Sequence, residues 1–166
     1  LLAHLADPTI GVVIHKSDFD RTVSRHAMGL VIDPSRIVDT MVQAMAHGLP
    51  GALDKLSTIY KLGDEGKDKG GKDLIRLFCV PAPKNQKLRR RTKNEFPDEW
   101  ERFLEYAGGD IRSMRLLRKK MPDWNYPGKP SNQPTEHDTW VLDQIVNDRG
   151  FKVDTDLAEA AVALSA

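Results

Sequence analysis

Short apolar runs and longer amphipathic stretches alternate along the chain. Residues 9–14 are apolar and rich in β-branched side chains, which is typical of a strand buried on both faces, as in parallel sheets. Residues 36–38 form a second strand candidate. Apolar spacing and turn signals predict helices before Pro8 and over residues 17–28, 40–47, 52–62, 73–80, 98–121, from Thr135 to the turn at 148–150, and 156–164.

Polar and glycine residues mark several of the helix ends. Ser17 or Asp18 can cap the helix that follows the first strand, and Gly29 stops it. Asp39 comes directly after the second strand and can cap the helix over residues 40–47, and Thr135 can cap a later helix. Each strand candidate is therefore followed at once by a helix.

The apolar side chains also predict which faces are buried. The expected inward faces are Leu53, Leu56, Ile59 and Tyr60 in one helix, and Trp140, Ile145 and Val146 in the helix after Thr135. The single cysteine, Cys79, lies in the apolar run 77–80 and is expected to be a buried, inert thiol. Two strand candidates are too few for a self-sufficient sheet, so the predicted fold class is α/β, helix-rich and short of strands.

Composition adds limits to this picture. The chain has 166 residues, 40% hydrophobic and 30% charged, with a net charge of +1, which suits one compact soluble domain with an appendage. No apolar run approaches the roughly 18 residues of a membrane helix, and no signal-peptide pattern opens the chain, so a cytoplasmic setting without membrane contact is expected. The first residues begin abruptly inside a predicted helix, as in a piece of a longer polypeptide.

Two groups of residues carry candidate chemistry. Residues 15–20, His-Lys-Ser-Asp-Phe-Asp, place carboxylates where a buried strand meets a helix, and open α/β sheets have their sites at such strand ends. Tyr106 and Asp110 are four apart in a long helix, so a hydroxyl and a carboxylate share one face. Between them, Gly108 and Gly109 each cost about 1 kcal/mol in a helix interior, which suggests the close approach of a ligand or another backbone.

The order of these motifs resembles a known family. Phe19-Asp20, preceded by His15, and the later Tyr106-x-x-x-Asp110 look like the second and third motifs of the DEDDy exonucleases, which have a ribonuclease H-like fold. The intervening sequence is similar to bacteriophage-type family A DNA polymerases. The similar segments are residues 39–42, 46–50, 71–75, 96–100, 140–145 and 147–150.

The resemblance implies a DNA-proofreading 3′→5′ exonuclease domain over residues 1–134 and a helical connector over 135–166, leading toward a polymerase domain. Asp20 and Asp110 would be metal ligands, and Tyr106 would orient the attacking water. Two divalent ions, Mg²⁺ or Mn²⁺, would be held once an Asp-x-Glu is supplied as well. The implied substrate is the 3′ end of single-stranded DNA. From the residues alone, Asp20 could instead be a first-turn helix acid, and Tyr106 an aromatic packing residue.

Two departures from the family pattern leave an alternative open. An Asp-x-Glu on a strand is missing from the chain, so the first motif and the early strands are expected upstream of Leu1. Lys16 stands where the family usually has Asn, and it could contact phosphate or signal a decayed site. The alternative is a non-catalytic DNA-binding or scaffolding remnant of such a domain. The isolated chain is expected to be inactive. Its strand 9–14 would be an uncovered sheet edge, which predicts an N-terminal complementing segment, self-association through that strand, or marked instability, and the complementing segment is the favoured outcome.

Basic residues are bunched. Residues 84–93 hold six cations and no acid, and are either a phosphate-contacting loop or a solvated one. The candidate nucleic-acid contacts are Lys16, Lys72, Arg89, Arg90, Arg91 and Arg112. Arg112, Arg115 and Arg118 are spaced three apart and could meet a DNA backbone or only solvent. Residues 66–73 nearly spell a nucleotide-binding P-loop, but Asp73 occupies the Ser/Thr position and would repel a phosphate.

Overall fold

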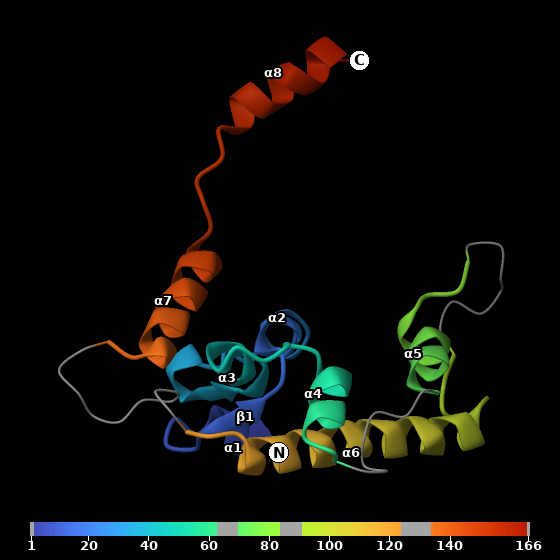
Figure 1. Ribbon diagram of the computed structural model, residues 1–166. Helices are drawn as coiled ribbons and strands as arrows, with labels where there is room; N and C mark the ends of the chain where they lie inside the picture. The colour runs from blue at the N-terminus through green and yellow to red at the C-terminus, as the bar shows by residue number, and fades with distance from the viewer. Residues whose placement is uncertain (1, 63–69, 84–90, 124–133, 166) are drawn as a thin grey trace.

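The computed structural model describes residues 2–62, 70–83, 91–123 and 134–165. These residues form a helix-rich α/β structure with a small parallel sheet (Figure 1). The elements are α1 (Leu2–Ala6), β1 (Val12–Ile14), α2 (Ser17–Met28), η1 (Pro34–Arg36), β2 (Ile37–Asp39), α3 (Thr40–Ala46), α4 (Leu53–Ile59), α5 (Gly71–Cys79), α6 (Pro97–Lys120), α7 (Glu136–Arg149) and α8 (Thr155–Ser165).

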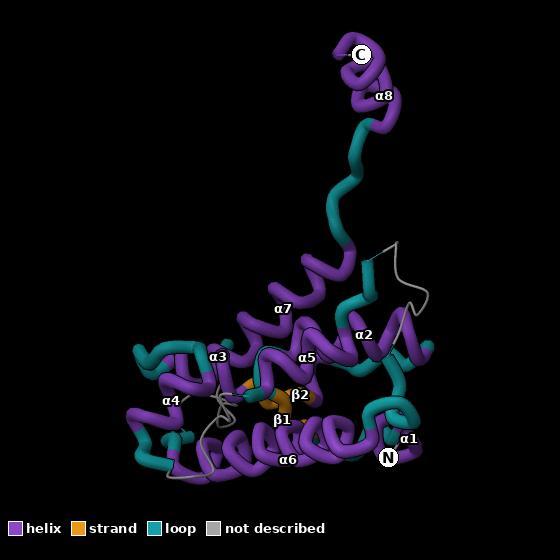
Figure 2. The backbone as a smooth tube through the Cα atoms, turned by 90° about the vertical axis from the view of Figure 1, so that its right-hand side faces the viewer, coloured by secondary structure: helices purple, strands orange, loops and turns teal. Residues whose placement is uncertain are grey.

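The two predicted strands pair with each other. β1 and β2 are parallel, with Val12 opposite Ile37 and Ile14 opposite Asp39. Within the described residues they are the whole sheet, so β1 has a strand neighbour on one side there. The long helix α6 runs past the strands on one side (Figures 1 and 2). The α/β class is confirmed at this level, and the ribonuclease H-like topology stays a prediction.

One hydrophobic cluster joins α3, α4 and α6. It contains Ala44, Leu56, Leu62, Leu117 and Met121, all buried. Leu53 and Tyr60 pack against it, as their predicted stripe requires, but Ile59 is exposed. Leu56 and Leu117 are fully buried, and burial of such side chains typically stabilises a fold by about 1.5–3 kcal/mol each. The cluster fixes the C-terminal half of α6 against the small helices that follow β2.

A second cluster attaches α7 to the sheet. Trp140 packs with Ile32 and Ile37, and α7 contacts η1. Thr135 begins α7 with a capping box, in which its hydroxyl and the Asp138 carboxylate bond each other's backbone N–H. The predicted inward face is only partly correct, because Ile145 and Val146 are exposed and the buried partner of Trp140 along α7 is Gln144. The domain boundary expected at residue 134 stays a prediction.

Two further expectations from the sequence are wrong. Val13 is 40% exposed, so β1 is not buried on both faces within the described residues. Cys79 is exposed at the end of α5, because the buried face of that short helix is formed by Gly71 and Leu74 instead. Apolar runs of this length do not themselves reveal how many faces are covered.

The cap of α2 also differs from the expectation. Neither Ser17 nor Asp18 caps it. Lys16 is the N-cap residue, with a left-handed backbone (φ 64°) and no side-chain cap bond. Gly29 ends the helix in a left-handed conformation, as predicted.

The last helix stands apart from the others. Residues 150–154 are an extended segment, and α8 beyond it is exposed along its whole length (Figure 1). Among the described residues, no helix combines the length and apolar character needed to cross a membrane.

Candidate functional site

The carboxyl ends of β1 and β2 lie side by side, because Ile14 and Asp39 are register partners. His15, Lys16 and Ser17 leave β1 there, and Asp39 and Thr40 leave β2. This is the edge at which parallel sheets place functional groups.

The Asp39 carboxylate organises this edge. It accepts hydrogen bonds from the backbone N–H of Lys16 (3.1 Å), Ser17 (2.7 Å) and Met41 (2.8 Å), and from the Ser17 hydroxyl (2.8 Å). The Met41 bond is the predicted cap of α3. The bonds to Lys16 and Ser17 were not foreseen, since their partners are 23 and 22 residues away. Asp39 is 1% exposed, so it fixes the start of α2, where Asp20 lies, from inside the molecule.

His15 has a structural role. Its Nδ1 lies 2.9 Å from the Thr40 hydroxyl, which itself donates to the Ile14 carbonyl at 3.3 Å. Because the Thr40 hydroxyl hydrogen is used in the bond to Ile14, His15 Nδ1–H is the donor to the Thr40 oxygen. This bond ties the loop after β1 to the start of α3.

Asp20 projects from the first turn of α2 and its residue is exposed. Partial desolvation raises the pKa of its carboxyl group, and the nearby negative Asp39 raises it further. The negative charges of the two carboxylates repel each other, and a bound cation would reduce this repulsion. Lys16, four residues earlier, is exposed and has its backbone N–H fixed by Asp39.

Tyr106 and Asp110 lie on α6, both partly buried. The Tyr106 ring stacks on Phe103, with centroids 6.5 Å apart, and Phe103 continues into a cluster with Phe78 and Trp100. A Cβ added to Gly71 of α5 would lie only 2.1 Å from the Tyr106 ring. The ring is thus packed between α5 and α6, and the role of its hydroxyl group stays a prediction.

The candidate DNA contacts are spread over several elements. Lys72 is exposed in the first turn of α5, and Arg91 lies over the Phe96 ring at 5.8 Å. Arg112 forms an ion pair with Glu105 on the same helix. Arg89 and Arg90 fall outside the described residues, as do residues 66–69 of the near P-loop.

One polar network could not be predicted from local sequence patterns. Arg21 is 5% exposed and donates to Gln144 and Asp148 of α7, and Arg25 donates to the same Asp148 carboxylate. The hydrogen bond from Arg25, with the positive charges of Arg21 and Arg25, lowers the pKa of Asp148. The network joins α2, the helix that also carries Asp20, to α7, and its partners are more than 120 residues apart in sequence.

The described residues gather no group of three or more His, Cys, Asp or Glu side chains that could hold a metal ion. Asp20 and Asp110 are therefore not part of such a group there. A divalent ion at either one would need further oxygen ligands, since Mg²⁺ prefers six. The convergence expected of these two carboxylates stays a prediction.

The fold is that of a helix-rich α/β protein, with the carboxylates of Asp20 and Asp39 near the carboxyl ends of its two strands. In sequence the chain is 32% identical over 166 residues to a DNA polymerase of Bacillus phage SP02. The match covers 98% of this chain and 24% of the polymerase, so the chain spans about a quarter of its relative's length. This similarity supports a DNA polymerase-related region. No family model and no solved structure matches the chain.

Proposed function

We propose that this chain is the 3′→5′ exonuclease region of a DNA polymerase, which removes nucleotides from the 3′ end of single-stranded DNA. The observation that carries the proposal is the position of Asp20 in the first turn of α2, the helix that follows β1, near the buried Asp39 at the carboxyl edge of a parallel strand pair. The similarity to a phage DNA polymerase supports DNA as the substrate and a polymerase domain in the same polypeptide as the partner.

Asp20 and Asp110 are the proposed ligands for Mg²⁺ or Mn²⁺. Carboxylate oxygens are the ligands that hard cations such as Mg²⁺ prefer, so the type of ligand fits. The number of ligands is too small, because the described residues bring together no group of three or more His, Cys, Asp or Glu side chains. An Asp-x-Glu from outside this chain is the proposed completion. Bound there, two ions would supply an activated water and charge stabilisation of the leaving oxygen.

The chain's own residues have positioning roles in this proposal. Asp39 fixes the β1–α2 junction and thereby the first turn that carries Asp20. The packing of Tyr106 between α5 and Phe103 leaves its ring few orientations, which suits a hydroxyl that must hold a water in place.

The test is degradation of 3′-labelled single-stranded DNA by a polypeptide that contains this region and its upstream segment, with Mg²⁺ or Mn²⁺. Asp20→Ala and Asp110→Ala should each lower the rate at least about a hundredfold, because two-metal sites contribute several kcal/mol. Asp123→Ala, an exposed acid just beyond α6, is the control and should leave the rate unchanged. Undiminished degradation in both site variants would refute the proposal.

The isolated 166-residue chain should show no appreciable degradation, because the residues that the structure describes bring together no group of three or more potential ligands, and two hard cations need several oxygens each. Metal-dependent trimming of DNA by this chain, abolished by Asp110→Ala, would contradict that part of the proposal.

A second candidate is a non-catalytic DNA-binding or scaffolding region. Lys16 favours it, since an exposed ammonium group lies at the start of the helix that carries Asp20. It predicts DNA binding without degradation, even when the upstream segment is present. The same degradation assay therefore separates the two candidates.

A further inference from the structure

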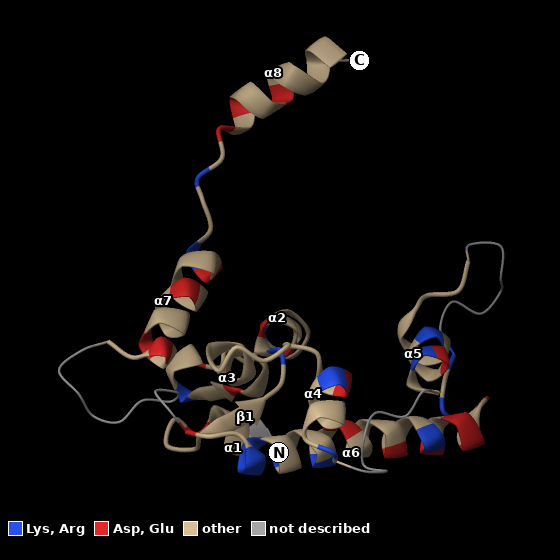
Figure 3. Cartoon of the chain, viewed as in Figure 1, with Lys and Arg blue, Asp and Glu red and all other residues tan. Residues whose placement is uncertain are grey.

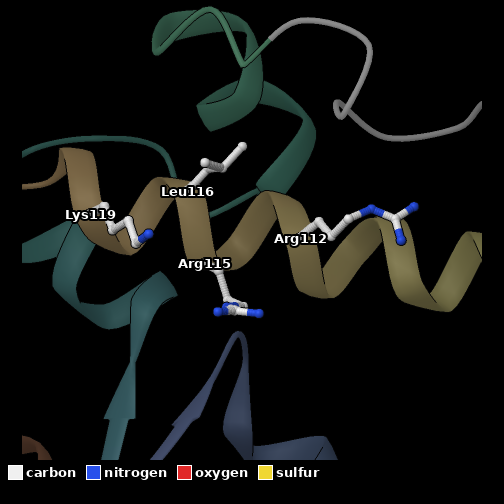
Figure 4. Close-up of a pocket in the computed structure, with 4 residues that line it drawn as sticks. All are labelled: Arg112, Arg115, Leu116 and Lys119. Carbon is white, nitrogen blue, oxygen red and sulfur yellow. The ribbon is translucent and has the colours of Figure 1, made fainter.

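The outer side of α6 carries a shallow hollow lined by Arg112, Arg115, Leu116 and Lys119 (Figure 4). Its volume is about 130 Å³. Leu116 packs against the cluster of α3, α4 and α6 and so forms a fixed apolar floor. No carboxylate lines the hollow, although acidic residues are frequent in the first half of the helix (Figure 3).

Two of the three cations lack an acidic partner. Within the described residues, the arginines that form ion pairs are Arg21, Arg25, Arg112 and Arg118. Arg115 and Lys119 form no ion pair there, and both are exposed. Arg112 is held along the helix by Glu105, and the glycines at 108 and 109 leave room for its guanidinium group. In the hollow, Arg112 is thus held by an ion pair, and the positive charges of Arg115 and Lys119 have no acidic partner within the described residues.

The hollow is distinct from the proposed exonuclease site. At about 100° per residue, Lys119 lies roughly half a turn around the helix from Asp110. Met114 and Leu117 follow Asp110 on its own side of α6 and are buried. The basic hollow therefore faces away from the side that carries Tyr106 and Asp110.

The spacing of the cations matches a nucleic-acid backbone. Arg112 and Lys119 are seven residues apart, or about 10.5 Å along the axis at 1.5 Å per residue. Phosphates along one strand of B-form DNA recur at about 3.4 Å along its axis, so three cations over this length match three or four successive phosphates. Arginine also binds phosphate oxygens in bidentate fashion.

We propose that this face of α6 is a second DNA-binding surface, on which Arg112, Arg115 and Lys119 bind consecutive backbone phosphates. It would hold a part of the DNA that is not in the exonuclease site. The inference relies on the DNA substrate of the proposed function but not on hydrolysis.

The test measures binding of a fluorescent double-stranded oligonucleotide to this chain by anisotropy, across a salt series. Arg115→Ala with Lys119→Ala should weaken binding about tenfold and reduce the slope of log K against log salt by about 1.8, or 0.9 for each lost contact. Arg102→Ala with Lys55→Ala removes the same charge from exposed positions outside the hollow and should change affinity less than about twofold. Circular dichroism establishes that both variants are folded.

Competitors identify the source of the phosphate. Affinity that rises with oligonucleotide length, with weak competition by inorganic phosphate, supports a backbone surface. Equal competition by inorganic phosphate would overturn it in favour of a simple anion site. Binding to phosphatidylserine vesicles that depends on Arg115 and Lys119, with oligonucleotide binding unchanged in the double variant, would overturn it in favour of a lipid surface.

The outcome is separable from that of the exonuclease proposal. Asp110→Ala should leave the effect of the Arg115 and Lys119 substitutions on oligonucleotide binding intact, whether or not the region degrades DNA. Equal affinity and equal salt slope in the double variant and the wild-type chain would refute the proposed DNA-binding surface on α6. They would not affect the exonuclease proposal.

Discussion

At the scale of single residues, the Asp39 carboxylate connects three backbone segments. It ends β2, caps α3 and accepts hydrogen bonds from Lys16 and Ser17 at the start of α2. Only the cap was predictable, because capping depends on neighbours within three residues. The bonds to α2 depend on strand pairing, which brings Ile14 beside Asp39.

Asp39→Ala should lower the free energy of unfolding by about 2–4 kcal/mol. Loss of the cap contributes about 1 kcal/mol and buried donors left unpaired add about 1–3 kcal/mol. Asp33→Ala is the matched control, since Asp33 accepts from Ser35 in the same manner at an exposed position. Urea unfolding of both variants measures the difference, and equal losses would mean that the buried bonds to α2 add no stability.

Lys16 is the second residue whose backbone matters. Its left-handed φ of 64° is disfavoured for residues that carry a Cβ atom, whereas Asn adopts this region more readily because its side chain can hydrogen-bond locally. We expect Lys16→Asn to raise the free energy of unfolding by about 0.5 kcal/mol. Lys55→Asn, inside α4, should lower it by a similar amount. Thermal unfolding compares the two, and destabilisation by both would show that the backbone of Lys16 is not under strain.

At the scale of elements, the sequence predicts where the helices begin and end, but it does not predict which side chains of each helix are buried. The caps at Asp39 and Thr135 and the stop at Gly29 place α3, α7 and the end of α2 within a few residues. Exposure of Cys79 and Val146 was missed, because a short helix can bury small or polar residues when a neighbour approaches closely. The candidate site was assigned by resemblance, and the packing around Tyr106 could not be seen in any local pattern.

The contact of α5 with α6 depends on a missing side chain. A Cβ on Gly71 would overlap the Tyr106 ring, so Gly71→Ala should cost about 1–3 kcal/mol and displace that ring. Gly108→Ala is the opposing control: its Cβ meets only the flexible end of Arg112, and helix propensity should give a gain of up to about 1 kcal/mol.

A double-mutant cycle makes this prediction specific. In a Tyr106→Ala background, Gly71→Ala should cost little, because the ring it would strike is gone. Urea unfolding of the four variants measures the coupling. Additive losses would show that Gly71 and Tyr106 do not constrain each other.

At the scale of the whole molecule, α7 is attached to the region that carries Asp20. Trp140 packs on the sheet, and the Asp148 carboxylate binds Arg21 and Arg25 of α2. Residues from early and late parts of the sequence thus meet across α2 and α7. This attachment could not be predicted, since each partner looks like an ordinary surface charge in its own helix.

Asp148→Asn should destabilise the molecule by about 1–3 kcal/mol at pH 7, because the buried Arg21 loses its charged partner while Asp148 itself is partly screened by solvent. The pKa of Asp148 is lowered in the folded state, so its stabilisation is present above the ordinary carboxyl pKa of about 3.9. It is lost as the pH falls through the lower, folded pKa. Urea unfolding at pH 7 and near pH 3 should therefore show the gap between wild type and variant shrink in acid. Asp143→Asn, an exposed acid of α7 without an arginine partner, should show no such gap.

The isolation of α8 has a consequence for the exchange of its amide hydrogens. Its 11 residues touch no other element closely enough to be buried, and a helix shorter than about 12–15 residues is marginal in water without tertiary support. Backbone amides over residues 158–165 should therefore exchange with deuterium nearly as fast as in an unstructured peptide, whereas those around Leu117 in α6 should be protected until the molecule opens. Mass spectrometry after brief labelling distinguishes the two, and slow exchange in α8 would reveal that another surface covers its apolar side chains in solution.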